Sequence, residues 1–222
     1  MKQTLSVVIS AFNKEKSLDR CLKSVQELVD EIIVVDDGST DNTEEVVGDI
    51  ISNSTSNIKY FKKSNGGVAT ARNYGFEQST GKYVCFLDAD DEIAPKFLDT
   101  CVDYLEKHRS ISLVYTSLMY VNGDTGSVSR WPGVYDYDAQ LRRKNQVPTC
   151  NVARRELWSR LAGQRQRYAP NGAGSEDADM WTRAGAYGMD ARKITEEPLF
   201  IYHGGGRTSV DYHEVDWLGW HP

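Results

Sequence analysis

Short apolar runs alternate with polar segments of helical character along the first half of the chain. Short, mostly apolar runs predict four strands, at 5–10, 32–35, 58–61 and 83–87. Apolar residues at helical spacing predict the helices that follow them, at about 18–28, 42–51, 65–81 and 97–108. Because such alternation forms parallel sheets with right-handed crossovers, we expect an α/β fold with a Rossmann-like, mostly parallel central sheet flanked by helices.

The pattern changes after Ile111. A strand at 113–120 and a hairpin-like turn at 122–124 precede an irregular stretch at 129–146 that is rich in Tyr, Trp and Arg. Further on we expect two helical patches, at 155–161 and 176–187, which flank a Gly-rich loop at 171–174. A last apolar strand is expected at 199–202. We therefore divide a single domain into a nucleotide-type half, 1–110, and a C-terminal substrate-shaping region, 111–222.

Composition narrows the class of protein. Of the 222 residues, 40% are hydrophobic and 26% are charged, as is ordinary for one globular domain. The formal net charge of −6 argues against nucleic-acid binding, because phosphate contacts need clustered Lys and Arg. No apolar run approaches the ~20 residues that span a bilayer, and the N-terminus does not resemble a signal peptide. The cysteines lack CxxC spacing and predict buried free thiols in a cytoplasmic protein: Cys21, Cys85, Cys101 and Cys150.

The strand at 83–87 is followed at once by four acids: Asp88, Asp90, Asp91 and Glu92. Adjacent carboxylates repel one another unless something positive sits among them, and hard oxygen ligands suit Mg²⁺ or Mn²⁺. A solvated acidic turn that caps the next helix is the alternative. In open parallel sheets, ligands bind beyond the carboxyl ends of the strands, where this turn is expected.

Three more polar loops are expected at the same edge, at 10–13, 36–41 and 65–73. The second offers a carboxylate to a base or a ribose, and the third offers backbone N–H groups and Arg72 to phosphate. Together with the acidic turn, they predict a pocket for a nucleoside diphosphate and a cation.

Four segments of the chain resemble the family 2 glycosyltransferases, which have the GT-A fold: SVVISAFNKEKSLDRCLKSV, EIIVVDDGSTDNTEEVV, NGGVATARNYGFEQSTGKYVCFLDADD and SEDADMWTRA. The resemblance covers about 5–184. It implies an inverting transfer of a sugar from a nucleoside-diphosphate donor, with a UDP-sugar favoured, to an acceptor hydroxyl. It also implies a Mn²⁺ or Mg²⁺ cofactor.

The resemblance also implies a role for each matching residue. The residues expected to contact the nucleotide are Ser10, Ala11, Phe12, Asn13, Asp37, Asn65, Gly67, Arg72, Asp88 and Ala89. Asp37 would bind the base and Asp88 the ribose, and Asp90 would hold the metal through the donor diphosphate. Asp177 would be the general base with Glu176 beside it, so the region 111–222 would carry the acceptor side, and His203 would be a further metal ligand.

Plainer interpretations remain for several residues. Asp36 can simply stabilise the turn through Gly38, Arg72 can be a surface residue, and His203 can be structural. Glu176 and Asp177 follow Ser175, a good N-cap, and would complement the helix dipole without any chemistry. Four aromatic residues could stack on a sugar or fill the core: Trp131, Tyr135, Trp158 and Trp181.

The alternatives to a glycosyltransferase are a non-catalytic nucleotide-sugar-binding module and a DxD phosphatase. The phosphatase would place its DxD on the first strand, whereas here it follows the fourth. The expected acceptor is a glycan, a lipid-linked molecule or a small molecule. The expected location is the cytoplasm, including the inner face of the membrane. Peripheral association with the membrane and a homo-oligomer are both compatible with the sequence.

Overall fold

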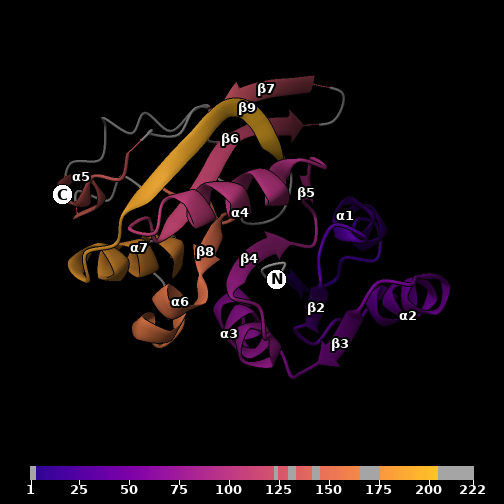
Figure 1. Ribbon diagram of the computed structural model, residues 1–222. Coiled ribbons are helices and arrows are strands. Elements are labelled where there is room, and N and C mark those ends of the chain that lie inside the picture. Colours follow the sequence, from indigo (N-terminus) through magenta and orange to yellow (C-terminus); the bar gives the residue numbers. More distant parts are fainter. Residues whose placement is uncertain (1–3, 123–124, 130–133, 142–145, 166–175, 205–222) are drawn as a thin grey trace.

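The computed structural model describes residues 4–122, 125–129, 134–141, 146–165 and 176–204 (Figure 1). Its strands are β1 (Leu5–Ala11), β2 (Glu31–Asp36), β3 (Ile58–Lys62), β4 (Tyr83–Asp88), β5 (Glu92–Ile93), β6 (Leu113–Asn122), β7 (Thr125–Ser129), β8 (Val152–Arg154) and β9 (Ala191–His203). Its helices are α1 (Leu18–Val25), α2 (Thr43–Asn53), α3 (Val68–Gln78), α4 (Phe97–Lys107), α5 (Tyr137–Leu141), α6 (Arg155–Leu161) and α7 (Glu176–Ala186).

One sheet runs through the described part of the chain. Its first four strands are parallel, as the sequence predicts, and they lie in the order β3-β2-β1-β4. The sheet continues through β8, β6, β9 and β5, where β8 is antiparallel to β4 and β6 while β6 and β9 are parallel. Figure 1 shows β6, β7 and β9 gathered at one end of the molecule and β2, β3 and β4 toward the other. The predicted α/β class, a central sheet flanked by helices, is confirmed.

The apolar runs are continuous because the parallel strands are covered on both faces. In β1, Val7 and Ile9 join the core that includes α1, α2 and α4, while Val8 joins the core that includes α3, α6 and α7. All three side chains are fully buried. The sheet is therefore a rigid base for the loops that leave its carboxyl edge.

Some predicted boundaries are wrong. The first helix ends at Val25 rather than near Leu28, because Gln26 is extended and Glu27 takes a left-handed φ of 69°. The strand at 199–202 is only the end of the 13-residue β9. The expected hairpin pairs β6 with β7, although its turn residues 123–124 lie outside the described part, as does the Gly-rich loop at 171–174. Strands β5 and β8 and the short helix α5 were not predicted from the sequence.

All four cysteines are buried and free, as predicted. In the described ranges, no helix has the length and apolar character needed to cross a membrane.

Candidate functional site

The loops that follow β1, β2 and β4 meet at one edge of the sheet. Ser10 is in register with Val35 on one side and with Asp88 on the other. Its hydroxyl donates a hydrogen bond to Oδ1 of Asp88 at 3.0 Å. Asp88 is therefore held at the end of β4, beside the loop that follows β1.

Asn13 ties the first loop to the second. It adopts a left-handed φ of 54°, which Asn tolerates better than most residues. Its N–H donates to Oγ of Ser39 at 2.9 Å, and its Oδ1 accepts from the N–H of Thr40 at 2.9 Å. In the same loop, Phe12 is 46% exposed, so its ring is available to a ligand.

Asp37 joins the second loop to the third. Its carboxylate accepts the N–H of Gly66 at 3.0 Å and that of Gly67 at 2.7 Å, and it pairs with Nζ of Lys63 at 2.5 Å. Gly38 permits this closeness, because a Cβ there would lie 2.8 Å from the backbone N of Asn65. The predicted nucleotide residues Asn65 and Gly67 are thus held against Asp37.

Asp36 stabilises the turn after β2, as the plainer interpretation of this residue predicts. It is buried, accepts the N–H of Ser39 at 2.7 Å and accepts the hydroxyl of Tyr60 at 2.7 Å.

Arg72 lies at the centre of the candidate site, and its interpretation as a surface residue is wrong. It is 2% exposed, and its Nη2 donates to Oδ1 of Asp88 at 2.8 Å. Its Nη1 lies 3.2 Å from Oε1 of Glu176 and 3.3 Å from Oδ1 of Asp177. Burial by itself lowers the pKa of Arg72, but the surrounding carboxylates outweigh it and raise that pKa above its ordinary value. One guanidinium therefore gathers the predicted ribose ligand and both residues of the predicted catalytic pair.

The carboxylate of Asp177 is oriented by further donors. Thr149 donates its hydroxyl to Oδ2 at 2.6 Å, and Nε2 of Gln164 donates to Oδ1 at 3.1 Å. Gln164 is itself fixed by Asn73, which accepts its N–H at 2.7 Å and donates to its carbonyl at 2.8 Å. These contacts come from elements far apart in the sequence.

Glu176 begins α7, where the helix dipole alone would lower its pKa. Burial instead raises the pKa of Glu176, and the neighbouring Asp177 raises it further. Ser175, the expected N-cap, lies outside the described residues.

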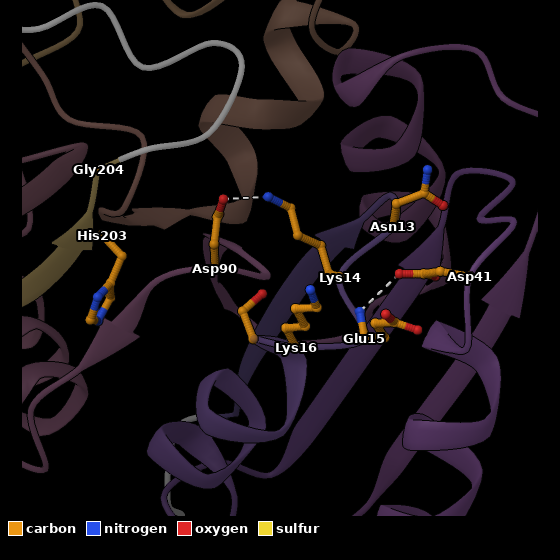
Figure 2. A pocket seen from close by; sticks show the side chains of 9 residues that line it. Asn13, Lys14, Glu15, Lys16, Asp41, Asp90, His203 and Gly204 are labelled. Carbon is orange, nitrogen blue, oxygen red and sulfur yellow. Dashed lines mark hydrogen bonds and ion pairs between the residues drawn. The ribbon is translucent and has the colours of Figure 1, made fainter. Parts of the chain in front are cut away.

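The acidic turn after β4 borders a cavity of about 480 Å³ (Figure 2). Asp90 reaches its wall and forms an ion pair with Nζ of Lys14. Asp91 is buried and accepts the N–H of His203 at 2.9 Å. Burial raises the pKa of Asp91, and the carboxylates of Asp88 and Asp90 raise it further.

His203 also lines this cavity, but its ring is engaged elsewhere. Its Nε2 lies 2.7 Å from Oε1 of Glu92, and Figure 2 shows the ring turned away from the carboxylate of Asp90. Within the ranges that the structure describes, no group of three or more His, Cys, Asp or Glu side chains is arranged to hold one metal ion. The role of His203 as a metal ligand therefore stays a prediction.

This arrangement can be compared with known proteins. A model of the family described as Glycosyl transferase family 2 matches residues 6–156, more than half of the chain. The chain belongs to this family.

Curated proteins are similar to parts of the chain. A chondroitin synthase from Pasteurella multocida is 34% identical over 134 residues, which are 58% of this chain and 14% of that protein. An uncharacterized glycosyltransferase from Rickettsia conorii is 35% identical over 187 residues, which are 80% of this chain and 29% of that protein. The chain thus spans less than a third of either relative.

Solved glycosyltransferases confirm the GT-A fold. Staphylococcus aureus TarS, in complex with UDP-GlcNAc, superposes with a TM-score of 0.73 at 22% identity, over 91% of this chain and 59% of that one. The mannosyltransferase PcManGT from Pyrobaculum calidifontis, in complex with GDP-Man and Mn²⁺, superposes with a TM-score of 0.69 at 20% identity. The superposition covers 93% of this chain and 59% of that one.

Two of the four aromatic residues that could stack on a sugar or fill the core are core residues. Trp158 is 3% exposed and Trp181 is 1% exposed, and their rings pack edge-on at 5.9 Å. The hydroxyl of Tyr135 donates to the carbonyl of Trp181 at 2.7 Å. Trp131 lies outside the described residues.

Sequence reasoning missed three residues of the site. Lys14 directly follows a predicted nucleotide loop, and its charge beside that loop was a usable signal. Thr149 and Gln164 belong to no motif and reach Asp177 only through the fold.

Proposed function

We propose that this glycosyltransferase transfers a sugar from a nucleoside-diphosphate donor, with a UDP-sugar favoured, to an acceptor hydroxyl with inversion at the anomeric carbon. The observation that carries the proposal is the link through Arg72 between Asp88, at the expected donor side, and Asp177, the expected base. Donor and acceptor chemistry would then lie on opposite sides of one buried guanidinium. The UDP-GlcNAc complex of TarS and the GDP-Man complex of PcManGT support a nucleotide-sugar donor.

The donor would lie along the three joined loops. Phe12 offers an exposed ring to the base, and Asp37 and the N–H groups near Gly67 line the loops beside it. Asp88 would accept a ribose hydroxyl while Arg72 and Ser10 hold its carboxylate in place.

The carboxylate of Asp90 fits a divalent cation, because it faces the cavity and Mn²⁺ and Mg²⁺ prefer oxygen ligands shared with phosphates. When bound there, such a cation would neutralise the charge that grows on the leaving diphosphate. Asp90 would hold it.

Asp177 would take the acceptor proton as the hydroxyl attacks from the face opposite the leaving group. A hydroxyl that loses its proton late in the reaction needs only a modest base, and general-base catalysis of this kind contributes roughly 10²–10⁴-fold. Arg72, Thr149 and Gln164 would keep the carboxylate aimed. A single displacement of this kind inverts the anomeric configuration.

The test is a transfer assay with a panel of UDP-sugars and acceptors, with NMR of the anomeric proton of the product. Asp177→Asn should lower the transfer rate by at least 10²-fold while the affinity for UDP stays within about twofold. A variant that keeps wild-type turnover, or a product with retained configuration, would contradict the proposed mechanism. UDP binding without transfer to any acceptor would favour the binding-module alternative.

A further inference from the structure

Lys14 occupies the position at Asp90 where a cation is expected. It follows β1, and its Nζ forms an ion pair with Oδ2 of Asp90 across the cavity (Figure 2). Its backbone is fixed, because its N–H donates to Oγ1 of Thr43 at 2.8 Å and its carbonyl accepts the N–H of Leu18 at 3.0 Å. Its side chain is 28% exposed and can therefore move while the loop stays in place.

The repulsion among the acids after β4 led us to expect a metal ion. In the described residues, protein cations instead pair with three of the four acids: Arg72 with Asp88, Lys14 with Asp90 and Arg20 with Glu92. Of these cations, Arg72 is buried and Arg20 also donates to the carbonyl of Asp90 at 2.8 Å. Lys14 is the one whose ammonium lies on the cavity wall next to the carboxylate that would bind the metal.

A metal ion and the Lys14 ammonium cannot both lie against Asp90 without strong Coulomb repulsion between the two cations. The lysine must therefore find another partner when the metal binds. An ammonium on a flexible stem binds phosphate oxygens as a point charge, and a donor diphosphate would bring such oxygens into this cavity.

We propose that Lys14 is a donor-phosphate ligand that holds Asp90 until the donor arrives. In the free enzyme it occupies the carboxylate and weakens binding of the metal alone. With the donor bound it moves to a phosphate oxygen and leaves Asp90 to the metal, so that metal and donor bind cooperatively. The move of Lys14 to a donor phosphate rests on the proposed function. The competition between Lys14 and a metal ion for Asp90 depends only on the Lys14–Asp90 pair.

Calorimetry of Lys14→Met tests both halves, because they predict opposite changes. Mn²⁺ alone should bind the variant about tenfold more tightly than wild type, since Asp90 is freed. UDP in the presence of EDTA should bind it about tenfold more weakly, since a charged phosphate contact is lost. Lys14→Arg keeps the positive charge, so its affinities for Mn²⁺ alone and for UDP in EDTA should stay close to those of wild type.

Lys23→Met is the matched control, because it removes the same charge from an exposed site on α1 that pairs only with Asp19 among the described residues. It should leave both affinities unchanged.

A Lys14→Met variant that binds Mn²⁺ alone no more tightly than wild type would overturn the inference, as would unchanged binding of UDP without metal. If wild type binds no nucleoside diphosphate under any condition, the proposed function fails. The Mn²⁺ titration then still decides whether Lys14 occupies Asp90 and weakens metal binding. Thermal unfolding of each variant checks that it is folded, and Lys14→Arg decides the matter if Lys14→Met is not.

Discussion

The hydroxyl of Thr149 lies 2.6 Å from Oδ2 of Asp177 and donates to it. Thr149 precedes β8 and Asp177 lies in the first turn of α7, so the contact joins two elements of the second half of the chain. With Arg72 and Gln164 on Oδ1, it fixes the carboxylate from both oxygens. Such fixing matters for a general base, because the proton acceptor must be aligned with the attacking hydroxyl.

Thr149→Val removes this hydroxyl while keeping the shape of the side chain. We expect kcat to fall about tenfold with little change in KM for the donor, because in the proposed mechanism the contact acts on the general base and not on the nucleotide. Thr149→Ser should restore most of the rate. Steady-state kinetics measure both constants, and a rise in donor KM with kcat unchanged would contradict this role.

Arg72→Met should destabilise the protein by about 3 kcal/mol, because three carboxylates would lose their shared, buried cation. Urea unfolding measures the free energy of unfolding. Arg109→Met, at an exposed position on the loop after α4, is the control and should change that free energy by less than about 0.5 kcal/mol. A loss at Arg72 no larger than the control would mean that the cluster is not held together by its guanidinium.

The pKa of Glu176 is raised in the folded protein, so the folded state binds more protons than the unfolded state above pH 4.5, the ordinary value. Glu176 therefore lowers the free energy of unfolding as the pH rises from the ordinary pKa of a glutamate through the raised pKa of Glu176 in the folded protein. Glu176→Gln should remove that effect. We expect the free energy of unfolding of the variant to exceed that of wild type by a margin that grows between pH 4 and pH 7. Urea titrations across this range measure the margin, and one that shrinks with pH would contradict the assigned direction.

The close packing of α3 on β1 depends on Gly75. A Cβ at this position would lie 2.3 Å from Cγ1 of Val8, so Gly75→Ala should cost about 1–3 kcal/mol of stability through overpacking. Gly48→Ala is the matched control, because it lies in the exposed interior of α2 with nothing within 4 Å of its Cβ. It should be neutral or stabilising by up to about 1 kcal/mol. Thermal melts compare the two, and equal effects would contradict the packing argument.

The parallel strands could be predicted because their side chains are buried on both faces, which leaves an unbroken apolar run in the sequence. The loop positions followed from the rule that ligands bind at the carboxyl edge. The short strands β5 and β8 carry too few residues to show a period, and they exist because long-range partners complete their ladders.

The candidate site was predicted as a set of motifs but not as a network. Nothing local marks Arg72 as buried, because its partners lie 16, 104 and 105 residues away in the sequence. The charge of Lys14 beside a predicted nucleotide loop was a signal, but its pairing with Asp90, which lies 76 residues away, could not be predicted from the sequence. Charge pairs between loops depend on the fold, and a sequence pattern does not report them.

The most direct test of the nucleotide site is a calorimetric titration with UDP, GDP, CDP, TDP and ADP, with and without Mn²⁺, on wild type and Asp90→Ala. We predict that UDP binds preferentially, that Mn²⁺ strengthens its binding, and that the metal effect disappears in the variant. Binding of every nucleotide regardless of metal, or of none, would contradict the assignment of Asp90 and of the edge around it as the donor site.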